Sequence, residues 1–386
     1  MLFPGDLKTK LPNTGTTIFT VMSALARKHG AINLSQGFPD FPVDQVLIEL
    51  VNQSMCSGHN QYAPMAGLPH LREVIAAKVN NAYGCSIDSD DEITITAGGT
   101  QAIYTAIAAT IRDGDEAIVF EPAYDCYVPA IKLHGGNPVQ LQLDPTNFQI
   151  DWNQVKKAVN SKTRLIIINT PHNPAGTVLS AKDMAQLEKI THNRDIIIIS
   201  DEVYEHIVFD GVEHQSVLRY PKLAERSFVV FSFGKTVHAT GWKTGYCIAP
   251  KNMMVEFRKI HRYMVFAANT PLQHALASYL SDPSNYVNIP SFYQRKRDYF
   301  NQLMATSKFK AMPCSGSYFV LLDYSGISNE KDTLFAERIT REHGVATIPV
   351  SVFCKNPPPD MRLIRVCFAK EDTTLLSAAE KLCQIQ

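Results

Sequence analysis

The stretch VVFSFGKTVHATGWKTGY, residues 229–246, joins an apolar run to a turn that is rich in small residues and holds two lysines. The run 229–231 predicts a buried strand, and Gly234 predicts a crowded turn directly after it. Lys235 therefore lies where a lysine is rarely found without a partner. Burial lowers the pKa of a lysine from ~10.4, and a neutral amine can form a Schiff base with an aldehyde. The stretch thus predicts a reactive amine at the end of a strand.

Similar apolar runs recur upstream and just downstream of this stretch. Strands without polar alternation are buried on both faces, as in a parallel sheet that helices cover on both sides. Helical patterns over 101–111 and 180–191 lie between the runs. Alternation of strand and helix predicts an α/β fold with a doubly wound, mainly parallel sheet. The expected strands are Ile93–Thr96, Ala117–Phe120, Leu165–Ile168, Ile196–Ile199, Val229–Phe231 and Tyr246–Ala249.

The pattern changes after about residue 283. A long amphipathic stretch, 286–307, precedes alternating strands near 318–322 and 362–368 and a closing helix from about Asp372. These elements are typical of a smaller α+β domain. We therefore expect a large domain over 45–282, and a small domain formed by 283–386 together with the N-terminal arm, 1–44.

Charge and composition narrow the classes of partner and compartment. Lys plus Arg and Asp plus Glu each number 37, so the formal net charge is zero, and no basic tract is visible. Neither nucleic acid nor a membrane is therefore expected as a partner. No run approaches the ~18 apolar residues of a transmembrane helix, and the N-terminus lacks the apolar stretch of a signal peptide. Eight scattered cysteines without a C-x-x-C pair are typical of reduced thiols in a cytoplasmic protein.

Ligands of open α/β sheets bind at the carboxyl ends of the strands. The residues that follow the predicted strands hold no metal-binding motif, so we expect no metal. They do hold Asp201, the Gly98-Gly99-Thr100 turn and Lys235. Pyridoxal 5′-phosphate (PLP) would use all three, because it presents an aldehyde, a phosphate and a ring nitrogen. Taken singly, each has a plainer interpretation: a helix N-cap, an ordinary turn and a solvated lysine.

Three competing motifs do not match the sequence. Gly234-Lys235-Thr236 ends like a P-loop, but Val229 stands where that motif requires glycine. Ser232-x-x-Lys235 with Lys243-Thr244-Gly245 is similar to a penicillin-recognising enzyme, yet its K-T-G lies far too close and no S-D-N is present. No G-x-G-x-x-G follows any of these strands, so a dinucleotide site is not expected.

Five ordered motifs carry a family resemblance that spans residues 15 to 370. They resemble the class I aminotransferases of PLP fold type I. Two more segments, S-Q-G-F-P-D-F-P (35–42) and I-P-V-S-V-F (348–353), are most similar to the methionine and kynurenine/glutamine-type (transaminase K) branch. The five motifs are N-Q-Y-A-P-M-A-G (60–67), A-G-G-T-Q-A (97–102), N-T-P-H-N-P-A-G-T (169–177), S-D-E-V-Y-E (200–205) and S-F-G-K-T (232–236).

The resemblance implies roles around the cofactor. Lys235 would form the Schiff base with PLP and move a proton at the substrate's Cα. Asp201 would pair with the ring nitrogen, Tyr204 and Asn173 would contact the ring's phenolic oxygen, and Tyr124 would stack on the ring. The residues implied around the phosphate are Gly98, Gly99, Thr100, Ser232 and Lys243, and Gln101 is implied as a further cofactor-binding residue. Tyr62 matches a tyrosine that reaches the phosphate from the neighbouring subunit, which implies a homodimer with shared active sites.

The resemblance also implies a substrate site. Arg365 would bind the α-carboxylate, with Gly37 and Asn173 beside it, because a guanidinium fork binds a carboxylate through two hydrogen bonds. Phe19, together with Phe266 and Phe353, would form an apolar side-chain pocket. All three phenylalanines could instead be core residues. The kynurenine aminotransferases have tryptophan where this chain has Phe19.

The sequence therefore predicts a PLP-dependent aminotransferase. It would move the α-amino group of an apolar or aromatic L-amino acid, with methionine as the first expectation, to a 2-oxo acid. A PLP-dependent β-lyase acting on cysteine S-conjugates or cystathionine, or a kynurenine aminotransferase, remains open. The effector module of a transcription regulator shares this fold, but no basic helix-turn-helix segment precedes residue 30.

Overall fold

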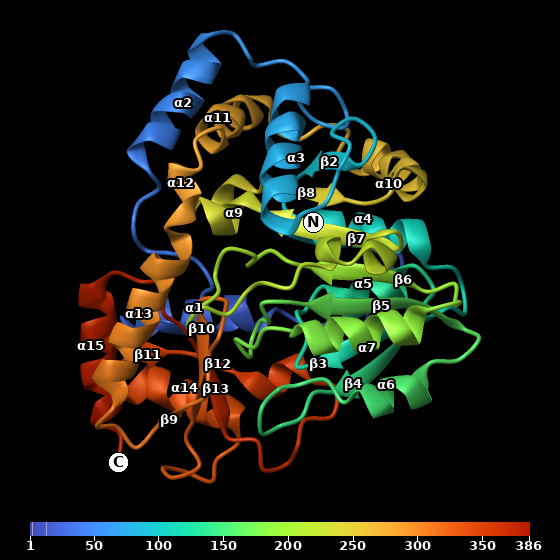
Figure 1. Ribbon diagram of the computed structural model, residues 1–386. Coiled ribbons are helices and arrows are strands. Elements are labelled where there is room, and N and C mark those ends of the chain that lie inside the picture. Colours follow the sequence, from blue (N-terminus) through green and yellow to red (C-terminus); the bar gives the residue numbers. More distant parts are fainter. Residues whose placement is uncertain (2, 13) are drawn as a thin grey trace.

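A seven-stranded sheet forms the centre of the larger lobe (Figure 1), in the order β2-β8-β7-β6-β5-β3-β4. The computed structural model describes residues 1–386 apart from residues 2 and 13. Every neighbouring pair in this sheet is parallel except the two pairs made by β8. The strands are β2 (Ile93–Thr96), β3 (Glu116–Glu121), β4 (Asn137–Gln142), β5 (Thr163–Asn169), β6 (Ile197–Asp201), β7 (Ser227–Ser232) and β8 (Gly245–Ile248).

Helices cover both faces of this sheet, so successive strand residues enter different cores. Ile118 of β3 packs into one core, and its neighbour Val119 packs into the other. On the first face lie α3 (Pro69–Tyr83), α6 (Trp152–Ala158), α7 (Ala181–Thr191), α8 (Pro221–Ala224) and α11 (Thr270–Leu280), with α2 (Gln45–Cys56) against α11. On the second face lie α4 (Gly99–Thr110), α5 (Tyr127–Leu133) and α10 (Lys251–Met264). Within the described part of the chain, no helix is long and apolar enough to cross a membrane.

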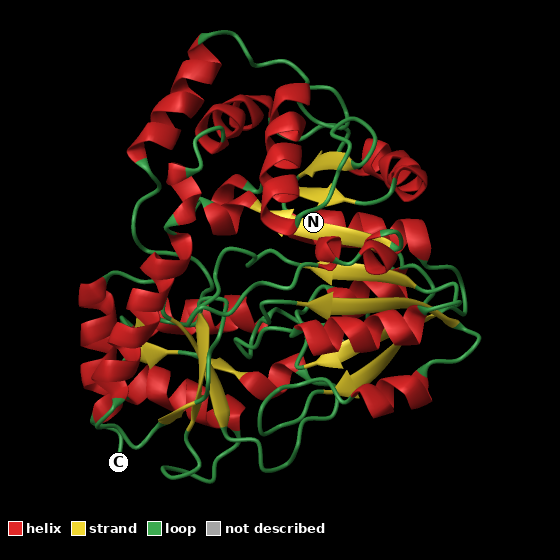
Figure 2. Ribbon diagram, in the orientation of Figure 1, coloured by secondary structure: helices red, strands yellow, loops and turns green. Residues whose placement is uncertain are grey.

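The smaller lobe contains its own antiparallel sheet, which Figure 2 shows apart from the large one. The N-terminal and C-terminal parts of the chain both contribute to this lobe. Strand β1 (Ile32–Asn33) pairs in parallel with β11 (Val345–Ala346) in a separate two-stranded sheet. The four-stranded sheet comprises β12 (Ile348–Pro349), β13 (Leu363–Cys367), β10 (Phe319–Asp323) and β9 (Lys310–Ala311). The helices are α1 (Ile18–His29), α12 (Ser284–Val287), α13 (Ile289–Met304), α14 (Asp332–Glu342) and α15 (Asp372–Cys383). The domain boundaries at 44/45 and 282/283 stay a prediction.

The direction of strand β8 explains why Lys235 and Lys243 lie at the same edge of the sheet. Because β8 runs antiparallel to β7, the residues before β8 lie at the same sheet edge as the residues after β7. The connection contains the short helix α9 (Phe233–Thr236) and the 3-10 turn η2 (Thr240–Trp242). It therefore brings Lys235 and Lys243 to the carboxyl edge of the parallel strands. Two further 3-10 turns are η1 (Val217–Arg219) and η3 (Val350–Phe353).

Edge strand β4 is the strand of the large sheet that the sequence did not predict. Its residues, NPVQLQ, alternate apolar and polar side chains and are none of them fully buried. An edge strand needs no continuous apolar run, since one of its sides lacks a neighbouring strand. The other six strands occur where they were expected, within a few residues.

Candidate active site

A cavity of about 180 Å³ opens at the carboxyl edge of the large sheet. Its walls come from the residues that end or follow β2, β3, β5, β6 and β7 and from the residues before β8. The sheet edge thus gathers side chains from widely separated parts of the sequence. The predicted site residues that line the cavity are Gly98, Gly99, Thr100, Tyr124, Asn173, Asp201, Tyr204, Ser232, Lys235 and Lys243.

Lys235 extends from α9 into this cavity. Its Nζ lies 2.6 Å from the hydroxyl oxygen of Tyr318 and 3.3 Å from the carbonyl oxygen of Gly37. Burial disfavours the ammonium form and lowers the pKa of Lys235 to about 8. A substantial fraction of the amine is therefore neutral near physiological pH, which a nucleophile requires.

Asp201 is the last residue of β6 and is buried at the opposite wall. Its Oδ2 accepts a hydrogen bond of 2.5 Å from the Tyr127 hydroxyl, and its Oδ1 lies 3.4 Å from the N–H of Val203. Burial raises the pKa of Asp201 to about 6, although the Tyr127 hydrogen bond and the charge of Lys235 act in the other direction. This carboxylate lacks a close cationic partner among the described side chains. A protonated ring nitrogen beside it would supply the positive charge that stabilises its ionised form.

The start of α4 lines the cavity close to Lys243. Gly98 precedes the helix with φ +85°, and a Cβ there would lie 3.6 Å from the Nζ of Lys243. A Cβ on Gly99 would meet Val203 at 2.9 Å. Backbone N–H groups at a helix N-terminus beside an ammonium favour a phosphate. Ser232 at the end of β7 adds a hydroxyl to the same cavity.

Arg365, on β13 of the smaller lobe, is buried next to the cavity residue Asn173. Its Nη1 donates to Asn173 Oδ1 at 2.8 Å, and its Nη2 donates to the carbonyl of Ser35 at 2.8 Å. Its Nε is buried without a partner among the described residues. Desolvation lowers the pKa of Arg365. An unpartnered N–H on a buried guanidinium is a ready donor for a carboxylate.

Aromatic rings surround this guanidinium. Its Cζ lies 3.9 Å from the ring centre of Phe319, 5.3 Å from that of Phe19 and 5.6 Å from that of Phe353. The ring centres of Phe19 and Phe353 are 5.9 Å apart. Phe266 lies elsewhere, with its ring against the exposed Tyr62.

Two other predicted residues do not line the cavity of their own chain. Tyr62 is 83% exposed. Gln101 lies in α4, where its side chain accepts from the N–H of Ala97 and donates to Thr105. Gly37 reaches the site through its carbonyl group, which contacts Lys235.

The sequence did not identify Tyr127 and Tyr318, which contact Asp201 and Lys235 directly. Both lie in apolar surroundings and look like core aromatics, so no sequence signal marked their hydroxyl groups. Their partners lie 74 and 83 residues away along the chain. Other unpredicted lining residues are Ile103, Asn169, Val203, Gly234, Thr240 and Thr244.

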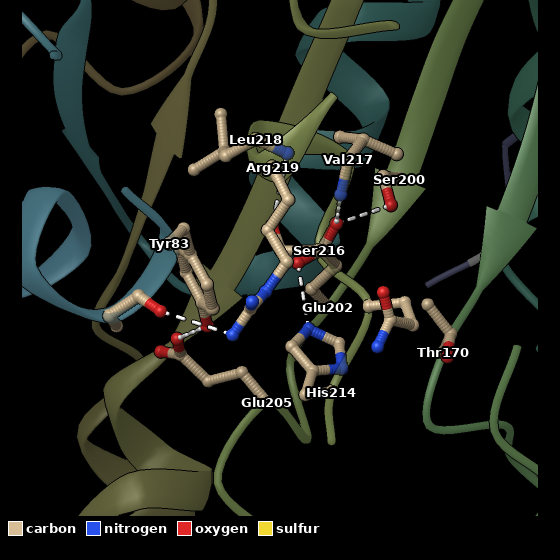
Figure 3. A network of polar contacts seen from close by, with 12 residues as sticks. Tyr83, Thr170, Ser200, Glu202, Glu205, His214, Ser216, Val217, Leu218 and Arg219 are labelled. Carbon is tan, nitrogen blue, oxygen red and sulfur yellow. Dashed lines mark hydrogen bonds and ion pairs between the residues drawn. The ribbon is translucent and has the colours of Figure 1, made fainter. Parts of the chain in front are cut away.

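Behind the turn that follows β6, Glu202 forms a polar network (Figure 3). It accepts hydrogen bonds from the Ser200 hydroxyl at 2.7 Å and from the N–H of Val217 at 3.1 Å. Its Oε2 lies 2.9 Å from His214 Nε2. Glu202 is fully buried, and these contacts fix the turn that carries Asp201.

Glu205 continues the network on the same side of the turn. It lies 2.5 Å from the ammonium of Lys78 and accepts a hydrogen bond of 2.6 Å from the Tyr83 hydroxyl. Tyr246 adds a contact at 3.2 Å. Burial is the largest single influence and raises the pKa of Glu205, but the charges of Lys78 and His206 and the hydrogen bonds from Lys78 and Tyr83 together outweigh it and hold the pKa at about 2. This carboxylate is ionised and fully partnered.

The fold and this site define a PLP-dependent transferase, and the comparisons with known proteins name its family. The family model for class I and II aminotransferases matches residues 29–382. The methionine aminotransferase of Escherichia coli is 51% identical over 379 residues, which cover 98% of each chain. Human kynurenine–oxoglutarate transaminase 1 is 33% identical over 392 residues, or 93% of each chain. The chain belongs to the class I and II aminotransferases.

Solved structures agree with this family. The crystal structure of YbdL from Escherichia coli, which identified a methionine aminotransferase function, has a TM-score of 0.97 at 50% identity and covers 99% of this chain and 100% of its own. The Thermus thermophilus aspartate aminotransferase bound to maleate has a TM-score of 0.90 at 28% identity, with coverage of 99% and 100%. This protein is an aminotransferase of PLP fold type I, and its cofactor is PLP.

The cavity fits that cofactor on its own geometry. It offers a buried carboxylate without a close cationic partner among the described side chains, a helix N-terminus at Gly98 and Gly99 close to the ammonium of Lys243, and a partly neutral amine. These are the counterparts of the ring nitrogen, the phosphate and the aldehyde.

Proposed function

We propose that this aminotransferase uses methionine, and apolar L-amino acids more generally, as amino donors and a 2-oxo acid as acceptor. The observation that carries the proposal is the buried guanidinium of Arg365 within a frame of phenyl rings. Two of its five N–H donors are used by Asn173 and Ser35, which leaves three for an α-carboxylate. Apolar rings beside that position favour an apolar side chain over a charged one. The similarity to the Escherichia coli methionine aminotransferase supports the same donor.

When bound, PLP supplies an aldehyde that condenses with amines and a ring that accepts the electron pair released at the substrate's Cα. We propose that Lys235 holds the cofactor covalently and then moves the proton at Cα, which its pKa of about 8 supports. Asp201, ionised above about pH 6, would keep the ring nitrogen protonated. Tyr204 and Asn173 would contact the ring oxygen, and Tyr124 would cover the ring face.

The remaining proposed contacts are those with the phosphate of the cofactor. The N–H groups at Gly98–Thr100, the hydroxyl of Ser232 and the ammonium of Lys243 would hold the phosphate, since all three line one end of the cavity. Gln101 would act from behind by fixing the start of α4, because its side chain binds the N–H of Ala97.

A donor assay tests the substrate proposal. PLP-loaded protein should convert methionine to its 2-oxo acid in the presence of an acceptor, with a kcat/KM at least about tenfold above that for aspartate. Arg365→Gln should lower kcat/KM for methionine by about 100-fold or more, because the α-carboxylate loses its charged partner. Arg362→Gln is the matched control, since this arginine of the same motif donates only to the carbonyls of Pro359 and Met361. Equal losses in the two variants would remove the role of Arg365.

The alternatives give different products in the same assay. Pyruvate and ammonia formed from a cysteine S-conjugate without any acceptor would identify a β-lyase. A kcat/KM for kynurenine above that for methionine would identify a kynurenine aminotransferase. Preference for aspartate would contradict the apolar pocket.

We also propose that the active enzyme is a homodimer with shared sites. Tyr62 is largely exposed and packs on Phe266, which is itself partly exposed, and Tyr263, which precedes Phe266 in the chain, is 86% exposed. A cluster of exposed aromatic rings supports a contact with a second copy. Light scattering should give twice the mass of the chain. Mixing Lys235→Ala and Tyr62→Ala chains should restore activity above that of either variant, because one site of the hybrid dimer regains both residues. No restoration would mean that Tyr62 does not act across subunits.

We place the enzyme in the cytoplasm as part of the same proposal. All eight cysteines lie within the described residues and are unpaired, which supports a reducing compartment.

A further inference from the structure

The amine of Lys235 contacts two groups from outside the large sheet. Tyr318 stands directly before β10 of the smaller lobe, and Gly37 belongs to the N-terminal segment. The Tyr318 hydroxyl lies 2.5 Å from the Gly37 carbonyl oxygen and 2.6 Å from Lys235 Nζ. A carbonyl oxygen only accepts hydrogen bonds, so the single hydroxyl proton of Tyr318 goes to Gly37. The Tyr318 oxygen must then accept an N–H of Lys235.

The backbone before Tyr318 is held in an unusual conformation. Ser317 has φ +61°, a left-handed value that side-chain-bearing residues rarely adopt, and it is fully buried. Its N–H donates to the carbonyl of Ile207 at 2.9 Å, and the N–H of Gly316 donates to the carbonyl of Gly176 at 2.9 Å. Such strain costs about 1–3 kcal/mol and persists where the surroundings enforce it, commonly at functional sites. Here it accompanies the placement of Tyr318 over Lys235.

Gly37 is packed too closely to carry a side chain. A Cβ at this position would lie 2.6 Å from Cζ of Phe319 and 3.6 Å from Cε2 of Tyr318. Its carbonyl oxygen lies 3.3 Å from Lys235 Nζ, which makes it the second acceptor for that amine. The close packing that excludes a side chain therefore accompanies a carbonyl that faces both Tyr318 and Lys235.

We propose that Tyr318 is a further catalytic residue of this enzyme, which with the Gly37 carbonyl orients the free amine of Lys235. A neutral amine has two N–H groups and one lone pair. With both N–H groups donated to these oxygens, the lone pair alone faces the cavity, ready to take the proton of the substrate's Cα. In that step the C–H bond at Cα breaks and an N–H bond forms on Lys235, and the electron pair of the C–H bond would be accepted by the bound PLP ring. The inference rests on the proton-transfer role proposed for Lys235.

The chain offers a matched control in Tyr293. This tyrosine is also fully buried, and its ring lies 5.8 Å from that of Tyr318. Its hydroxyl lies 2.8 Å from His238 Nδ1 and does not contact Lys235. Tyr293→Phe therefore removes a buried hydroxyl from the same aromatic cluster without removing an acceptor of the lysine.

The first experiment measures the titration of Lys235 itself. Full-length protein is loaded with pyridoxamine 5′-phosphate, which has no aldehyde and leaves Lys235 free, and is acetylated over a pH series. Mass spectrometry of the peptide that contains Lys235 gives the midpoint. An acceptor stabilises the ammonium more than the amine, so Tyr318→Phe should move the midpoint to lower pH by about one unit. Tyr293→Phe should leave it in place. Coincident midpoints for the wild type and Tyr318→Phe would overturn the proposal.

Steady-state kinetics with PLP-loaded protein provide the second readout. Tyr318→Phe should lower kcat by about 10- to 100-fold while KM for the amino acid stays within about twofold, because the group proposed to bind the substrate carboxylate is Arg365 and not Tyr318. Tyr293→Phe should keep kcat within about threefold. A rise in KM with unchanged kcat would make Tyr318 a substrate-binding residue and contradict the proposal. The phenyl ring keeps its packing, and a thermal unfolding scan verifies that each variant is folded.

The two readouts separate this inference from the proposed substrate. The acetylation midpoint needs no amino acid, so it stands even if methionine proves a poor donor. A Lys235 that resists acetylation across the whole pH series would overturn its role as a free base, and the role of Tyr318 with it.

Discussion

Asp201, at the end of β6, and Glu205, in the turn that follows, lie four residues apart and are both buried, but their pKa values shift in opposite directions. Asp201 faces the cavity with a phenol as its closest side-chain partner, and its pKa rises to about 6. Glu205 faces the interior beside Lys78, and its pKa falls to about 2. This short segment thus carries one carboxylate whose charge is satisfied within the chain and one whose charge is left for a ligand.

This difference indicates how a buried charge can be assigned to stability or to function. A charge with internal partners stabilises the fold above its pKa, and removing one partner is costly. A charge without them destabilises the cofactor-free fold until a ligand supplies the partner. Substitutions on the two sides of the turn should therefore change different quantities.

The largest expected effect lies on the cavity side. Lys235→Ala should lower transamination by about four orders of magnitude or more, because both the covalent link and the proton transfer are lost. PLP should still bind non-covalently, and the free energy of unfolding should change by no more than about 1 kcal/mol. Lys251→Ala, at an exposed lysine paired with Asp91, is the control and should retain full activity. Turnover of Lys235→Ala at the wild-type rate would contradict the site.

Glu205→Gln should show the reverse behaviour. It leaves the Lys78 ammonium buried without its charged partner, so urea unfolding should show a loss of about 3–5 kcal/mol. The kcat of the folded fraction should stay within a few-fold of the wild type. Glu213→Gln removes the exposed carboxylate that pairs with Arg219 and should cost no more than about 1 kcal/mol. If Glu205→Gln and Glu213→Gln lower the free energy of unfolding by the same amount, Glu205 is not a stabilising partner of Lys78.

Asp201→Asn should change stability less than Glu205→Gln does, and with the opposite sign. The pKa of Asp201 is raised, so its ionisation opposes folding of the PLP-free protein as pH rises from about 4 to 6. Above pH 6 the asparagine variant without PLP should be more stable by up to about 3 kcal/mol, and near pH 4 the gain should vanish. Glu205 stabilises in the other direction: its contribution is complete above about pH 4.5 and declines as pH falls toward 2. A PLP-free Asp201→Asn protein that is less stable than the PLP-free wild type at pH 8 would contradict the contrast between Asp201 and Glu205.

The cofactor half of the site could be predicted from the sequence because its geometry is local. Asp201, Ser232 and Gly98 each end or follow a buried strand, and parallel strands bring those ends to one edge. The position of Lys243 needs one further fact, the antiparallel direction of β8. That direction could not be read from the apolar run alone, since parallel and antiparallel core strands look alike there.

The substrate half depends on contacts between distant parts of the chain. The Tyr318 hydroxyl and its acceptor at Gly37 are 281 residues apart, and Glu205 is 127 residues from Lys78. Tyr318 lies in a run that is otherwise apolar, so the sequence could mark it only as a core residue. Arg365 was found through the family resemblance, because an arginine on a strand with apolar neighbours could equally face solvent. The residues of the polar network carried no sequence signal of partnership.

The two-lobe origin of the site has a consequence for how its selectivity could be redesigned. The pocket for the cofactor is built on the large sheet and fixed from behind by Glu202 and Glu205, whereas Phe19 and Phe353 belong to the smaller lobe. Substitutions at those two rings leave every group around the phosphate and ring nitrogen untouched. With the roles proposed for Phe19 and Phe353, donor preference would be open to change by a few substitutions that leave the residues proposed to hold PLP in place.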